Sequence, residues 1–178
     1  LLGAIEQAAD DGLPMAAQVA PRPVGVLLGL ELTLNIFSAH PVFREISDLP
    51  FAEKVSRLNQ PAFRARLLAD EPVPDNPFLK VMLRSFGKMF QLSDPVDYEP
   101  GPERTIEAIA ARRGVSNEAA ALDLMLENDG RGMLYLPFLN YSQGSLEPIR
   151  AMMESPVSLP GLSDGGAHVG MICDGSFT

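Results

Sequence analysis

The sequence is poor in the side chains from which metal sites and disulfides are built. It has one cysteine, Cys173, and two histidines among 178 residues. A single cysteine excludes an internal disulfide, and a reducing cytoplasm fits this usage. His-x-His pairs, His-Glu-x-x-His and paired cysteines are all missing. The chain as given therefore does not assemble a complete metal site of its own.

Basic side chains are also scarce, with 14 Lys and Arg against 23 Asp and Glu and a net charge of −9. Nucleic acids and anionic membranes need basic patches, so neither is expected as a partner. We expect no signal peptide. The longest apolar stretch, residues 24–30, is too short to span a bilayer. No Gly-rich phosphate loop or Gly-x-Ser-x-Gly elbow occurs, which disfavours nucleotide binding and serine hydrolysis.

The most informative stretch is VSLPGLSDGGAHVG, residues 157–170. An apolar run ends in Asp164, two glycines follow, and His168 comes four residues after the aspartate. A β/α-barrel presents catalytic residues in this way, at the carboxyl ends of its strands. Asp-Gly-Gly is equally common in plain turns, and the pattern alone leaves both interpretations open.

A carboxylate at a strand end can bind a metal or act as a general base towards a metal-bound water. Asp164 is therefore the candidate catalytic residue and a candidate metal ligand. His168 fits metal binding, proton transfer, substrate contact or a purely structural role. Cys173 is predicted to be a buried small hydrophobe, Asp174 a turn residue, and His40 a loop residue rather than a ligand.

Periodicity and capping signals predict a helix-rich chain. The helices are expected at residues 1–11, 51–58, 61–69, 105–113, 116–128 and 145–153, and the strands at 15–20, 133–139 and 157–162. Residues 24–37 are predicted to form a loop followed by a short helix or buried turn. Residues 78–90 fit either a helix or an irregular hairpin.

Two further features bear on a site. Arg22 stands between Pro21 and Pro23, which stiffen the backbone so that the arginine can point into a site with little entropic loss. A surface arginine in a turn is the competing interpretation. Residues 38–97 have a helical, proline-punctuated pattern, and a long block of this kind is typical of an insertion over a site.

Three segments together resemble one family. They are QVAPRPVG at residues 18–25, DYEPGPERTIEAIAARRGVSNEAAALDLML at 97–126, and GLSDGGAHVGMICDGSFT at 161–178. The chain resembles the amidohydrolase superfamily, and within it the D-aminoacylase (N-acyl-D-amino-acid deacylase) branch. The resemblance implies an α/β fold that is part of a (β/α)8 TIM barrel, with residues 1–178 forming one partial domain. Residues 15–20 and 157–162 would be its seventh and eighth strands, and residues 30–100 would be a helical insertion near the active-site mouth.

The resemblance also implies a chemistry. It is zinc-dependent hydrolysis of a non-peptide amide bond in a small-molecule N-acyl-D-amino acid. Asp164 would be the last-strand aspartate that moves a proton beside the metal. Arg22, Gln18 and His168 would contact substrate, and Arg22 would bind the substrate carboxylate.

The family's histidine ligands would lie outside this stretch, which alone is expected to be inactive. We further expect self-association through exposed apolar surface. The competing hypothesis is a non-catalytic helical binding or assembly module in which the Asp164 loop is only a turn.

Overall fold

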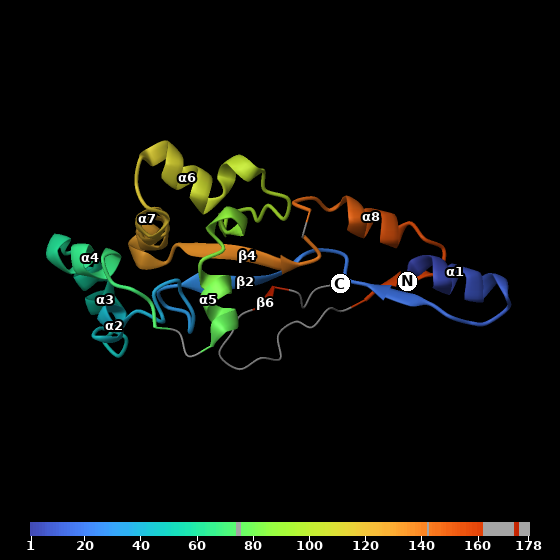
Figure 1. The fold of residues 1–178 in the computed structure, drawn as a ribbon, viewed down its shortest axis with the longest axis horizontal. Helices are drawn as coiled ribbons and strands as arrows, with labels where there is room; N and C mark the ends of the chain where they lie inside the picture. The colour runs from blue at the N-terminus through green and yellow to red at the C-terminus, as the bar shows by residue number, and fades with distance from the viewer. Residues whose placement is uncertain (74–75, 142, 162–172, 175–178) are drawn as a thin grey trace. The chain divides into compact units, whose positions relative to one another are not determined.

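The computed structural model describes residues 1–73, 76–141, 143–161 and 173–174. The chain divides into two compact units (Figure 1). Unit 1 comprises Leu1–Val26 together with Pro137–Thr178, and unit 2 comprises Leu27–Leu136. Two strands, β2 (Val24–Gly29) and β4 (Met133–Leu139), carry the chain from one unit to the other.

Unit 1 is built on a pair of short parallel strands. β1 (Ala17–Val19) pairs with β5 (Ser158–Pro160) in the register Ala17↔Ser158 and Val19↔Pro160. Two helices, α1 (Leu2–Asp10) and α8 (Glu147–Met153), belong to the same unit. α8 contacts both strands and leads directly into β5. The connection from β1 to β5 spans residues 20–157 and ends in α8, and parallel strands need a long crossover connection rather than a tight turn.

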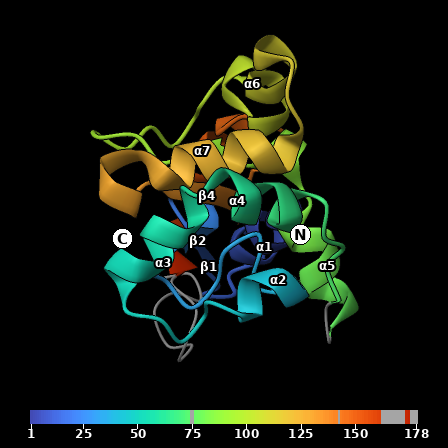
Figure 2. The ribbon, with the colours of Figure 1, turned by 90° about the vertical axis from the view of Figure 1, so that its left-hand side faces the viewer.

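Unit 2 consists mostly of helices. They are α2 (Pro41–Arg44), α3 (Phe51–Leu58), α4 (Pro61–Leu68), α5 (Pro77–Leu83), α6 (Ile106–Arg113) and α7 (Asn117–Gly130), with 3-10 turns at Phe86–Lys88 and Pro102–Arg104. α4 contacts both α2 and α3, and α3 also contacts α7 (Figure 2). α7 leads into β4, and Figure 1 shows this helix end-on beside the start of the strand.

The α6–α7 hairpin follows the capping rules closely. The Thr105 hydroxyl accepts a hydrogen bond from the N–H of Ala108 at 3.2 Å, and the Ser116 hydroxyl accepts one from Ala119 at 3.1 Å. Gly114 ends α6 at φ 66°, a left-handed conformation that glycine adopts without strain. The predicted helices at 105–113 and 116–128 are thus confirmed.

A close approach joins the end of α7 to β4. Regular helical geometry stops before Glu127, and Asn128 and Asp129 have positive φ. The chain then passes Gly132, where a Cβ atom would collide with the carbonyl oxygen of Leu124. Only glycine lets the backbone turn so tightly against the helix that precedes it.

The second sheet has the order β3-β4-β2-β6. β3 (Phe90–Gln91) is antiparallel to β4, and β6 (Cys173–Asp174) is antiparallel to β2. The large core side chains buried most completely are Leu28, Leu30, Phe37, Leu58, Leu67, Met89, Ile106, Leu122, Leu124, Met125, Leu134 and Tyr135. Burial of these side chains is the main stabilising contribution.

Two sequence-based expectations need correction. Residues 24–29 form strand β2, not a loop, and all but one of its residues are buried. A strand buried on both faces has no polar alternation, and its two glycines suggested a turn instead. The backbone of Asp174 lies in β6 rather than in a turn.

The fold expected from the sequence is a helix-rich part of a (β/α)8 barrel that contains two of its strands. The described residues form small two- and four-stranded sheets and no closed barrel. The remaining elements agree with the predictions, although the strands at 15–20 and 157–162 are shorter than expected. The region 78–90 resolves into α5, a 3-10 turn and the start of β3. Among the described helices, none has the length and apolar character that crossing a bilayer requires.

Candidate active site

The candidate site begins where β1 and β5 end. The ladder continues past the paired residues, since the N–H of Gly161 donates to the carbonyl of Val19 at 2.9 Å. At the other end, the N–H of Ala17 donates to the carbonyl of Val157 at 2.8 Å. Because the strands are parallel, their carboxyl ends meet at one edge. The residues that follow them are therefore brought to a common place.

Gln18 lies directly against the segment that leads towards Asp164. A Cβ atom at Gly161 would stand 2.8 Å from Cβ of Gln18 and 3.1 Å from its Cγ. Gly161 is buried while Gln18 is exposed. The absence of a side chain at position 161 is what lets β5 run this close to Gln18.

Arg22 follows β1 by three residues. Its side chain is half-buried, and its Nε atom is shielded from solvent. Pro21 is half-buried and Pro23 is buried, so the two prolines are packed rather than exposed. The structure thus places Gln18 and Arg22 on one continuous segment at the carboxyl end of β1.

Asn140 was not singled out from the sequence. It follows β4 directly, is exposed, and has a left-handed backbone with φ 58°. Its Nδ2 atom donates to the carbonyl oxygen of Ala20 at 3.5 Å, across 120 positions of sequence. Its position just after a predicted strand and its polar side chain were the only available signals.

Asp164 and His168 lie outside the described residues, so their roles stay predictions. Cys173 and Asp174 are described by their backbone in β6, where Asp174 pairs with Gly25 and Cys173 with Val26. This register places the backbone of Asp174 opposite a residue only three positions after Arg22.

A zinc site needs several His, Cys, Asp or Glu side chains close together. Across residues 1–73, 76–141, 143–161 and 173–174, no group of three His, Cys, Asp or Glu side chains converges. Arg22 does not change this, because a guanidinium carries only donors and no lone pair to give a cation, and Gln18 adds a single amide oxygen. The described part of the chain therefore does not by itself fit a zinc ion.

His40, the one histidine in the described ranges, occupies a different environment in unit 2. It precedes α2 and is 5% exposed, with its ring edge-on to Phe37 at 5.3 Å between centroids. Its Nδ1 stands 4.0 Å from Oδ2 of Asp70 and has no hydrogen-bond partner among the described residues. Burial lowers the pKa of His40. The Asp70, Glu118 and Glu71 carboxylates oppose that shift, and Arg84 adds to it.

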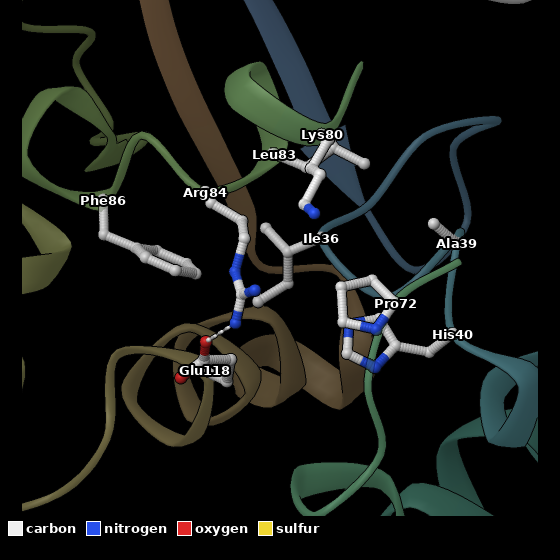
Figure 3. A pocket seen from close by; sticks show the side chains of 9 residues that line it. All are labelled: Ile36, Ala39, His40, Pro72, Lys80, Leu83, Arg84, Phe86 and Glu118. Atoms are coloured by element: carbon white, nitrogen blue, oxygen red, sulfur yellow. Dashed lines mark hydrogen bonds and ion pairs between the residues drawn. The ribbon is translucent and has the colours of Figure 1, made fainter. Parts of the chain in front are cut away.

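A small cavity lies beside this histidine (Figure 3). Its lining residues are Ile36, Ala39, His40, Pro72, Lys80, Leu83, Arg84, Phe86 and Glu118. The guanidinium of Arg84 is 3.3 Å from Glu118 and 3.8 Å from Glu71, so its charge is already balanced. The cavity volume of about 10 Å³ has room for about one water molecule and none for a substrate.

The comparison with known proteins adds one family. The model described as "Amidohydrolase family" matches residues 2–178. No curated protein and no solved structure matches the chain. The match supports a TIM-barrel type of fold and a metal-dependent hydrolase with a small-molecule substrate. Because the family model covers almost all 178 residues, the chain belongs to the amidohydrolase family.

Proposed function

We propose that the protein hydrolyses the amide bond of an N-acyl-D-amino acid. The observation that carries the proposal is the parallel pairing of β1 with β5, which brings Gln18 against Gly161, three residues before Asp164. An amidohydrolase works with side chains gathered at the carboxyl ends of parallel strands, and the parallel pairing of β1 with β5 supports this proposal. The Ser-Asp-Gly-Gly-Ala-His segment is the basis for choosing the D-aminoacylase branch.

The proposed roles follow from side-chain chemistry. Asp164 acts as a general base that takes a proton from the attacking water, and then as a general acid that passes this proton to the leaving amine. Arg22 binds the substrate carboxylate, since a guanidinium matches a carboxylate with two parallel N–H donors. Gln18 and His168 contact the substrate nearby. The described residues do not hold a zinc ion, so the proposal takes the metal ligands from outside them, with Asp164 as one candidate.

Arg22 suits this role by its packing. Its two flanking prolines are packed against protein, and its Nε atom is shielded from water. A partly desolvated guanidinium binds a carboxylate more strongly than a fully hydrated one, because less water screens the pair. The anionic N-acyl amino acid is the substrate class that this cation fits.

Two wider features also belong to the proposal. Residues 30–100 fall within unit 2, and we propose them as an insertion near the mouth through which substrate enters. Leu13, Met15 and Leu159 of unit 1 are 56%, 50% and 59% exposed, and we propose self-association through this apolar surface. Cytoplasmic location is proposed from the cysteine usage.

The decisive experiment is the substitution Asp164→Asn in the full-length enzyme, assayed with an N-acyl-D-amino acid. We expect kcat to fall by roughly a hundredfold or more, because a positioned general base contributes about 10²–10⁴-fold. Metal content measured on the same sample should stay at the wild-type level if Asp164 mainly moves the proton. Turnover near the wild-type rate would reject the assignment and favour the helical binding module instead.

A further inference from the structure

Two successive backbone carbonyls at the end of β1 are held by residues from distant parts of the chain. The carbonyl of Val19 accepts from the N–H of Gly161 at 2.9 Å. The next carbonyl, that of Ala20, accepts from Nδ2 of Asn140 at 3.5 Å. The segment before Arg22 is therefore anchored first to β5 and then to the residue that follows β4.

The anchor on Ala20 matters because of the residues that follow it. Pro21 and Pro23 have no N–H, so the Pro21-Arg22-Pro23 segment has only one backbone donor of its own. With so few backbone hydrogen bonds available, a side-chain contact at Ala20 has a large share in fixing where the segment leaves β1.

Asn140 is itself well suited to reach Ala20. Its backbone is left-handed at φ 58°, a conformation that asparagine adopts far more readily than most residues with a side chain. This turn comes immediately after β4, at the point where the chain enters the polar residues 140–144. The side chain is exposed, so the contact with Ala20 is made at the surface rather than in the core.

We infer that Asn140 is a positioning residue that acts through Arg22. By holding the Ala20 carbonyl it sets the direction in which the Arg22 guanidinium meets the substrate carboxylate. The inference rests on the proposed function, because it assumes that Arg22 binds that carboxylate.

The test uses two variants of the full-length enzyme. Asn140→Asp keeps the size and shape of the side chain but replaces the donor to Ala20 by a carboxylate oxygen. Asn140→Gly removes the side chain, and glycine keeps the left-handed backbone without strain. Each variant is assayed with an N-acyl-D-amino acid and with its carboxamide, which lacks the charge that Arg22 would bind.

For the carboxylate substrate we expect both variants to raise KM about three- to tenfold, the effect of losing one hydrogen bond. KM for the carboxamide and kcat for both substrates should change by less than about twofold, because the substrate charge is the only feature affected. In an Arg22→Ala background, Asn140→Asp should have no further effect on KM.

The outcomes separate the two ideas. If Arg22→Ala raises KM for the carboxylate but the Asn140 variants do not, the positioning role is wrong and the proposed function stands. If Arg22→Ala leaves KM unchanged, the carboxylate-binding role fails first. A parallel loss with both substrates would make Asn140 a structural residue only and would reject the inference.

Discussion

The α6–α7 hairpin and the β1–β5 pair are held together by opposite means. In the hairpin, the capping hydrogen bonds join residues three positions apart, Thr105 with Ala108 and Ser116 with Ala119. In the strand pair, Ala17 meets Ser158, and Ala20 meets Asn140. The helix ends of the hairpin are therefore fixed by residues close in sequence. The candidate site instead depends on contacts between residues more than a hundred positions apart.

The largest effect should come from Gly132→Ala, at the junction between the hairpin and β4. The added Cβ would collide with the Leu124 carbonyl, a backbone atom that cannot swing away. We expect a loss of about 2–4 kcal/mol of unfolding free energy, within the range of overpacking and backbone strain. Urea denaturation followed by circular dichroism would measure it.

The matched control for that substitution is Gly3→Ala. Gly3 lies in α1 with no atom within 4 Å of an added Cβ. Alanine is the better helix former there, so we expect unchanged or slightly higher stability, by about 0.5–1 kcal/mol. Equal losses at positions 3 and 132 would contradict the steric explanation.

A smaller loss is expected for Gly161→Ala in the strand pair. Here the new Cβ would meet the side chain of Gln18 at 2.8 Å rather than backbone. We expect about 1–3 kcal/mol of destabilisation. The double variant with Gln18→Gly should recover part of the loss, since it removes the atoms in conflict. If the double variant is as unstable as the sum of the two single variants, Gln18 is not the cause.

Next in size are the helix caps of the hairpin. Thr105→Ala and Ser116→Ala each remove one hydrogen bond to the first turn of a helix. We expect about 1 kcal/mol for each, and close to additive effects in the double variant. Ser116→Asp is the control, because aspartate also caps helices well and should retain stability. Strongly non-additive losses would show that the two caps depend on each other. The stability of each helix end would then not be set by its neighbours in sequence alone.

The smallest effect is a pH dependence at His40. Burial lowers its pKa below the ordinary value of 6.5, so at mildly acidic pH the unfolded chain binds the proton more readily than the folded one. The contribution of the neutral, buried His40 to the free energy of unfolding is therefore complete above about pH 6.5, and it is lost as the pH falls below that value. Comparing urea midpoints at several pH values for the wild type and His40→Gln would detect it. If the urea midpoint changes equally with pH in the two proteins, His40 is not the cause of the pH dependence.

The same contrast explains what could be predicted from the sequence. Thr105, Gly114 and Ser116 mark their helix ends through neighbours, so residue order alone was enough. β2 was missed because a fully buried strand shows neither alternation nor helical spacing, and its partner β6 comes from residues 173–174. The sequence marks Asn140 only as a polar residue after a predicted strand. It does not indicate Ala20 as the partner, because that contact depends on how two strands are placed.

The expectation for β1 and β5 depended on another kind of information. Their individual patterns were weak, at three residues each, and only the family resemblance made them neighbours. The observed parallel register agrees with that arrangement. The roles of Asp164, His168 and the zinc ion are not reached by this reasoning, because they depend on residues outside the described ranges.

The division of the chain into units also has a consequence for synthesis on the ribosome. Unit 2 is one continuous segment, Leu27–Leu136, and can gather its helices as soon as it has emerged. β1 emerges earlier, yet its partner β5 begins only at Ser158. At about 5–20 residues per second, β1 waits on the order of ten seconds with an unpaired edge. Unit 1 is therefore the part of the protein that forms late. During that interval the unpaired edge of β1, where the candidate site begins, is exposed to pairing with other nascent chains.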